Sequence, residues 1–245
     1  MSDPGMRGFV DVHSHVVPSG DDGAHEIEDG LALCRLAYEA GTDVLFATPH
    51  AHAPWDTFPR SPARDATYAA ALPVMQKEVA TWGLELRRGW EVYPTVIAPE
   101  NVEEYALEGT RAILIEFPGF WVDLDDAIEI ITDAGTVVEA AGLVPVLAHP
   151  ERCRAVSDDP DCVRPLVERG WLLCVNAPSF LGGHGATAER TVWRLLDAGL
   201  VSLAASDGHT PGRPPILNDA YAVVCERSGE PIARPLFTGS ALPWS

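Results

Sequence analysis

The chain has 245 residues, of which 47% are hydrophobic and 22% charged, a composition typical of a globular protein with a substantial core. Acidic residues outnumber basic ones by 36 to 17, which gives a net charge of −19 and argues against a nucleic-acid-binding face. The apolar stretches are shorter than the roughly 20 residues that cross a bilayer, and residues 1–8 lack the apolar run of a signal peptide, so we expect a cytoplasmic protein without membrane insertion.

Short apolar runs alternate with stretches of helical periodicity along the chain. The runs, interpreted as buried strands, are residues 9–12, 44–47, 84–92, 112–117, 143–148, 171–175 and 201–205. The clearest helix begins near His25 and stops at Gly41, and two others cover about residues 125–141 and 188–198. This alternation predicts an α/β fold with parallel strands, and the length favours one barrel, a single domain over residues 1–245.

The five cysteines are expected to be free thiols, because their number is odd and no C-x-x-C pair occurs. Cys34 and Cys174 lie in apolar runs and are predicted to be small core residues. A thiol phosphatase needs an arginine six positions after its cysteine, and none of the five has one. That mechanism is therefore excluded.

Metal-ligand side chains follow the predicted strands, at the end where functional groups of parallel α/β folds gather. Six of the seven runs end in or beside His, Asp or Glu, and the remaining one ends at Asn176. The candidate ligands are His13, His15, His50, Glu91, Glu116, His149, Asp207 and His209. Imidazoles and carboxylates bind zinc, manganese and iron(II), and this number exceeds what one ion uses. We therefore expect at least two divalent ions.

The motifs H-x-H, T-P-H, G-x-E, I-E-F-P, H-P-E-R and S-D-x-H, in this order over residues 9–215, resemble the polymerase and histidinol phosphatase (PHP) superfamily. More closely, residues 11–15, 21–24, 47–50, 149–152 and 213–215 resemble bacterial protein-tyrosine phosphatases that act on tyrosine kinases of capsule and exopolysaccharide synthesis. The resemblance implies a distorted (β/α)7 barrel of the PHP type. It also implies two or three divalent metal ions, manganese or else iron or zinc, and hydrolysis of phosphomonoesters.

Matched motif by motif, the resemblance assigns the metal ligands to the eight residues above and adds Asp22. Asp21 is expected to lie at a helix start instead. Arg152 and Arg213 match the phosphate-binding arginines, and Asp207 or His209 is a candidate for protonating the leaving oxygen. The mechanism implied is attack on phosphorus by a hydroxide held between two ions. The implied partner is a phosphotyrosine protein, a tyrosine kinase, and no sign of a particular oligomeric state is present.

Three other functions stay open at this point. A PHP phosphoesterase for a small metabolite such as histidinol phosphate would share the ligands, although the segments 21–23 and 213–215 favour the tyrosine-phosphatase branch. A metal-binding regulatory module without turnover is a second alternative, against which the intact ligand set speaks. An amidohydrolase-like enzyme would usually carry a bridging lysine, and Lys77, the only lysine, lies in a polar helical stretch.

Overall fold

The computed structural model describes residues 7–52, 57–119 and 124–245. Its strands are β1 (Phe9–Asp11), β2 (Thr42–Ala47), β3 (His50–Ala51), β4 (Glu85–Arg88), β5 (Glu91–Val92), β6 (Ala112–Glu116), β7 (Val144–Ala148), β8 (Leu172–Asn176) and β9 (Leu203–Ala205). They pair in parallel in two sheets, ordered β1-β2-β4 and β3-β5-β6-β7-β8-β9.

The two sheets are parts of one barrel wall. β3 continues β2 beyond Thr48 and Pro49, and β5 continues β4 beyond Gly89 and Trp90, so the strand predicted over residues 84–92 is split in two. At Gly89 the backbone passes so close to its neighbours that a Cβ would lie 2.6 Å from Leu107 and 2.8 Å from Thr48.

Hydrogen bonds between the ends of β1 and β9 close the barrel. The Asp207 N–H donates to the His13 carbonyl at 2.9 Å, and the His15 N–H donates to the Gly208 carbonyl at 2.8 Å. Within the described residues, seven strands, two of them interrupted, thus follow one another around the barrel, and the predicted α/β barrel is confirmed.

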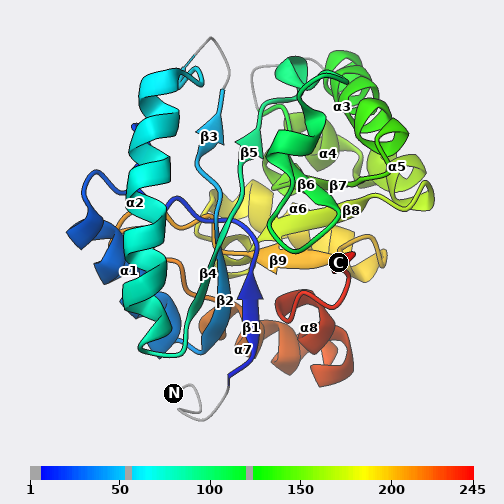
Figure 1. Ribbon diagram of the computed structural model, residues 1–245. Coiled ribbons are helices and arrows are strands. Elements are labelled where there is room, and N and C mark those ends of the chain that lie inside the picture. Colours follow the sequence, from blue (N-terminus) through cyan, green and yellow to red (C-terminus); the bar gives the residue numbers. More distant parts are fainter. Residues whose placement is uncertain (1–6, 53–56, 120–123) are drawn as a thin grey trace.

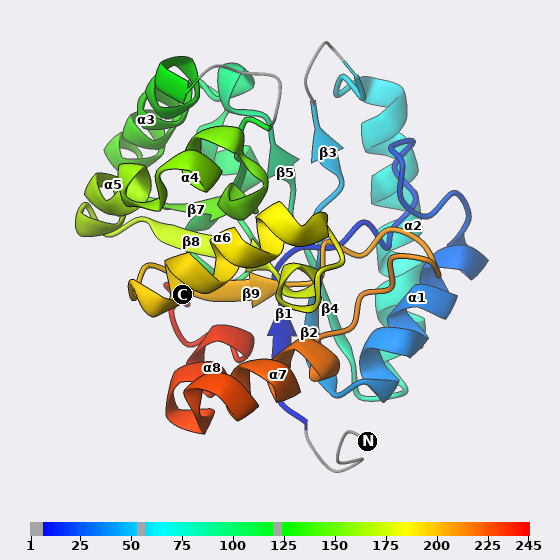
Figure 2. The same cartoon turned by 180° about the vertical axis from the view of Figure 1, so that it is seen from behind.

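Helices surround the strands (Figures 1 and 2). They are α1 (Ile27–Glu39), α2 (Pro62–Ala80), α3 (Leu124–Ala140), α4 (Arg154–Asp158), α5 (Arg164–Glu168), α6 (Gly185–Asp197), α7 (Asn218–Ser228) and α8 (Glu230–Phe237). Short 3-10 turns are η2 (Pro94–Val96), η3 (Val102–Tyr105), η4 (Pro150–Arg152), η5 (Pro160–Val163) and η6 (Ala177–Leu181). The three predicted helices correspond to α1, α3 and α6. Across the described residues, no helix is long and apolar enough to cross a membrane.

The strands β1, β2, β6, β7, β8 and β9 each contribute to two apolar clusters, because successive side chains point to opposite faces. In β6, Ala112 and Leu114 belong to the barrel interior, while Ile113 and Ile115 pack under the helices. Glu116 continues the inward row and is thereby directed to the mouth of the barrel. Cys34 and Cys174 are fully buried, as predicted.

Candidate metal centre

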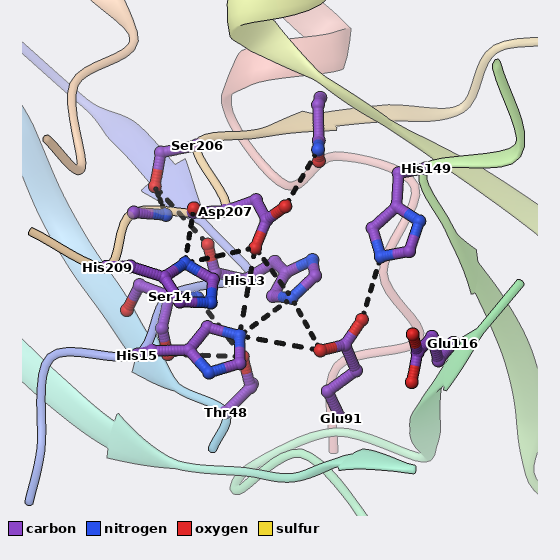
Figure 3. A network of polar contacts seen from close by, with 12 residues as sticks. His13, Ser14, His15, Thr48, Glu91, Glu116, His149, Ser206, Asp207 and His209 are labelled. Carbon is purple, nitrogen blue, oxygen red and sulfur yellow. Dashed lines mark hydrogen bonds and ion pairs between the residues drawn. The ribbon is translucent and has the colours of Figure 1, made fainter. Parts of the chain in front are cut away.

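All nine side chains predicted as metal ligands meet at the carboxyl ends of the strands (Figure 3 shows seven of them). Within the described residues they form four groups whose ligand atoms lie within 4.8 Å of one another. The groups are His15, Asp22, His50 and His209; His13, His15 and Asp207; His13, Glu91 and His149; and His50, Glu91 and Glu116. Since His13, His15, His50 and Glu91 each belong to two groups, the nine residues make one continuous cluster.

The H-x-H pair after β1 supplies the centre of this cluster. The Nε2 atoms of His13 and His15 lie 3.2 Å apart, so the extended chain aims both rings at one point, as its period predicts. The His15 ring also stacks on His209, with ring centroids 3.7 Å apart. This pairing brings the first and last strands of the barrel to the same site.

Glu91, at the start of β5, lies between three imidazoles. Its Oε1 lies 2.8 Å from His149 Nε2, and its Oε2 lies 3.0 Å from His50 Nδ1 and 3.2 Å from His13 Nε2. Burial raises the pKa of Glu91, but the charges of His13 and His50 outweigh it and hold that pKa well below the ordinary value. Glu116 behaves oppositely, because burial and the nearby charge of Glu91 raise its pKa to about 8. The pKa values of these two neighbouring carboxyl groups are thus shifted in opposite directions.

Both predicted phosphate-binding arginines contact Asp207. Its Oδ2 accepts hydrogen bonds from Arg152 and Arg213, each at 2.9 Å, and from the Asn176 amide at 2.9 Å. Burial raises the pKa of Asp207, yet the charges of His13 and His209 lower it to well below the usual range. Arg152 from η4 and Arg213 from the β9–α7 loop therefore reach the same edge of the cluster from two sides.

Two of the candidate ligands have strained backbones. His149 and Asp207 have φ values of 42° and 53°, in the left-handed region that non-glycine residues rarely adopt. Next to Asp207, a Cβ on Gly208 would lie 2.6 Å from the Pro215 backbone. Such strain costs about 1–3 kcal/mol per residue and persists where surrounding contacts hold the chain, which is common at functional sites.

The prediction that Asp21 lies at a helix start is wrong. α1 begins only at Ile27, and the Asp21 side chain is buried in the β1–α1 loop. Its Oδ2 lies 2.8 Å from His15 Nδ1 and accepts the His50 N–H at 3.2 Å. Burial raises the pKa of Asp21, but the hydrogen bond and charge of His15 lower it below the usual range. A carboxylate on the second nitrogen of a ligand histidine fixes the ring orientation, so Asp21 supports the site from behind.

Two more buried carboxylates, which the sequence reasoning missed, support the strand ends. Asp11 Oδ1 accepts the N–H groups of Ser206 at 3.0 Å and His13 at 3.3 Å, which ties β1 to the residues after β9. Glu151 Oε1 accepts the Asn176 N–H at 3.0 Å and the Ser179 hydroxyl at 2.7 Å. Burial raises the pKa of Asp11 to about 6 and that of Glu151 to about 7. The sequence signal for both was an acidic residue two positions from a histidine at a strand end.

The donor set fits divalent cations. Among the described side chains, the buried Glu116 Oε2 makes no hydrogen bond, and the buried Glu91 Oε2 and His50 Nδ1 lie 3.0 Å apart without the geometry of one, although buried polar atoms normally form hydrogen bonds. A cavity of about 110 Å³ adjoins the cluster, lined by seven of the nine candidate ligands and by both arginines. Imidazole nitrogens and carboxylate oxygens in this mixture suit zinc, manganese and iron(II).

Comparisons with known proteins agree with this geometry. The family described as "Capsular polysaccharide synthesis, CpsB/CapC" matches residues 9–242. Tyrosine-protein phosphatase CpsB of Streptococcus pneumoniae is 29% identical over 238 residues, which are 94% of this chain and 95% of that protein.

Solved structures show the same likeness. The structure described as YwqE from Bacillus subtilis and CpsB from Streptococcus pneumoniae, unique metal-dependent tyrosine phosphatases, has a TM-score of 0.80 and 28% identity, over 95% of this chain and 92% of the other. A putative histidinol phosphatase from Listeria monocytogenes, with a TM-score of 0.52 and 13% identity over 80% of this chain and 94% of the other, shares the fold alone. The resemblance inferred from the sequence motifs is confirmed.

Proposed function

The chain belongs to the CpsB/CapC family of capsular polysaccharide synthesis, and we propose that it is a metal-dependent phosphatase that hydrolyses phosphotyrosine in a protein. One observation carries the proposal: nine metal-ligand side chains form one cluster, and two arginines adjoin it at Asp207. A phosphoryl group needs both features, cations for its negative oxygens and planar guanidinium donors that orient it.

We propose two or three divalent ions at this cluster, manganese first and iron or zinc as alternatives. Four overlapping groups that share His13, His15, His50 and Glu91 support more than one ion. Divalent ions held by such ligands supply Lewis acidity and activate water as a nucleophile near neutral pH. The nine ligands include three histidines (His15, His50 and His209) around Asp22, whose carboxylate is the most exposed of the set at 49%.

Arg152 and Arg213 are proposed to bind the phosphoryl oxygens. Their side chains are 33% and 44% exposed, whereas that of Asp207 between them is 3% exposed. The guanidinium groups therefore line the cavity while their ion pairs with the buried Asp207 hold them in place. They would orient the phosphate and neutralise the charge that grows in the transition state. This role needs no protein nucleophile.

Asp207 and His209 are the proposed groups for handing a proton to the leaving phenolate oxygen. Both are also candidate metal ligands, and an atom that holds an ion carries no proton to donate. The role therefore requires that one of the two side chains stay free of the ions; if both are ligands, water must supply the proton. We also propose that residues 1–245 act as one domain and that the substrate is a tyrosine kinase.

The direct test is phosphate release from a tyrosine-phosphorylated peptide and from histidinol phosphate, with chelator-stripped protein before and after addition of Mn²⁺. Release from the peptide only when Mn²⁺ is present supports the proposal. Release from histidinol phosphate alone would move the function to a small metabolite. No release from either substrate, with the metal bound, would refute the proposed phosphotyrosine hydrolysis and favour a metal-binding module without turnover or another substrate.

A further inference from the structure

Arg64 connects two loops of the metal centre without being a ligand. It is the third residue of α2, and its backbone N–H donates to the Oγ of Ser61, the N-cap residue. Its guanidinium donates to three carbonyl oxygens: Ser19 at 2.9 Å, His50 at 2.8 Å, and Phe58. One side chain therefore joins the β1–α1 loop to the segment between β3 and α2.

Two of the three carbonyls belong to segments that carry candidate ligands, and the third belongs to a residue whose ring contacts one. Ser19 is three residues before Asp22, and His50 is itself a candidate ligand. The Phe58 ring stacks on the His50 imidazole, with ring centroids 5.6 Å apart and an interplanar angle of 3°. The Arg64 hydrogen bonds thus fix the backbone on both sides of the group formed by His15, Asp22, His50 and His209.

The ligands of this group depend more on such hydrogen bonds for their position than the other candidate ligands do. Asp22 is half exposed and lies in a loop, with its Oδ1 3.6 Å from His50 Nε2 and 3.4 Å from His209 Nε2. β3, which carries His50, is only two residues long. By contrast, His13 and Glu91 are buried within the barrel mouth, where the strand ends themselves fix their position.

An arginine is well suited to this task. Its planar guanidinium presents several donors in a fixed fork and can serve three carbonyls at once, whereas a lysine has one compact ammonium. The aliphatic stem also packs under the loop: at Gly20, which has a φ of +75°, a Cβ would lie 3.5 Å from Arg64 Cγ.

We infer that Arg64 is a positioning residue, which holds Asp22 and His50 at a spacing that binds one of the ions of the centre. The inference rests on the proposed metal-dependent function and adds to it a residue that acts through two ligand loops. Removing the guanidinium should therefore weaken the binding of one ion and leave the binding of the others unchanged. A general loss of folding would instead weaken all of them.

Arg60 offers a matched control four residues earlier. Its guanidinium pairs with Asp65 and Glu104 and lies over the rings of Trp90 and Tyr105. Among the described residues, these contacts of Arg60 are with carboxylates and aromatic rings, not with the carbonyls of the ligand loops. Replacing Arg60 removes a comparable cation from the same region and should leave ion binding unchanged.

The experiment measures Mn²⁺ binding to chelator-stripped protein by following free Mn²⁺ with electron paramagnetic resonance, for the wild type, Arg64→Met, Arg64→Lys and Arg60→Met. We expect one binding step of both Arg64 variants to weaken by about 10- to 100-fold, the range for residues that orient metal ligands. The melting temperature of the metal-free protein should stay near that of the wild type. Added Mn²⁺ should restore phosphate release, because the defect is in binding.

The inference is overturned if both Arg64 variants bind every ion as the wild type does, or if Arg60→Met weakens the same step equally. If Arg64→Met does not fold, Arg64→Lys, which keeps the charge and the stem, decides the question. Uniform weakening of all steps with a lower melting temperature would assign Arg64 a structural role only. A wild type that binds no Mn²⁺ would refute the proposed function itself, which is a separate and recognisable result.

Discussion

The Asp21→Asn substitution tests whether a buried carboxylate behind the site controls metal binding. Asp21 uses both oxygens: Oδ2 contacts His15 Nδ1 and the His50 N–H, and Oδ1 accepts the Gly23 N–H at 3.3 Å. An asparagine has one oxygen and one NH2 group, so in either orientation a donor faces a donor. The change also removes the negative charge that holds the His15 ring.

The size of the effect follows from these contacts. A hydrogen bond to a charged group contributes about 1.5–3 kcal/mol. Since about 1.36 kcal/mol corresponds to a factor of ten, loss of the contact between His15 and Asp21 should weaken ion binding by roughly 10- to 150-fold. That range overlaps the losses typical of residues that orient metal ligands.

The assay is Mn²⁺ titration of the stripped protein, together with phosphate release at low and saturating Mn²⁺. Asp29→Asn is the control, because Asp29 is an exposed aspartate in the first turn of α1 and its substitution changes the net charge equally. Asp21→Asn should need more Mn²⁺ for half-maximal activity, whereas Asp29→Asn should not. Unchanged Mn²⁺ affinity in folded Asp21→Asn protein would show that this carboxylate does not orient His15 for metal binding.

Three further outcomes are expected. Asp207→Asn should abolish phosphate release while far-ultraviolet circular dichroism stays that of the wild type, because it removes a candidate ligand and the anchor of both arginines; a fully active variant would contradict the assignment. Arg152→Met should raise KM for the phosphopeptide and lower kcat without changing the Mn²⁺ requirement, as measured by steady-state kinetics at saturating Mn²⁺. Unchanged KM and kcat would contradict a role in phosphate binding. The metal-free protein should lose stability as pH rises from about 6.5 to 8. Burial raises the pKa of Glu116 to about 8; burial lowers the pKa values of His15 and His50, but neighbouring carboxylates outweigh it and raise them, so the folded state holds more protons than the unfolded one. Melting curves across this range should fall, Mn²⁺ should flatten them, and a rise with pH would contradict the charge arrangement.

The strands were predictable because buried parallel strands are apolar on both faces. β7, with the sequence VPVLA, is an unbroken apolar run, and its end at His149 was visible without knowledge of the fold. The break between β4 and β5 was not visible, because it depends on how Gly89 meets Leu107 and Thr48, residues that are distant along the chain.

The gathering of the ligands was predictable from their positions after strands, but their fine placement was not. Asp21 and Asp22 are adjacent and chemically identical, so no local pattern tells which one faces the ions. The difference arises from the loop path, where Gly23 passes so close to His15 that a Cβ would lie 2.2 Å from its carbonyl oxygen. The role of Arg64 likewise leaves no sequence motif, because Arg64 hydrogen-bonds to backbone carbonyls, which every residue has.

The closure of the barrel has a consequence for how the protein matures. Asp11 and the Ser206 N–H that it binds are 195 residues apart, and the His15–His209 stack spans nearly the same length of chain. Contacts of such separation form late in folding, because a long loop must close before they stabilise anything. During synthesis, the ribosome must therefore release the segment around residue 206 before the centre can assemble. Full coordination of an ion by the whole cluster is therefore a late event in folding, because it needs both ends of this long loop in place.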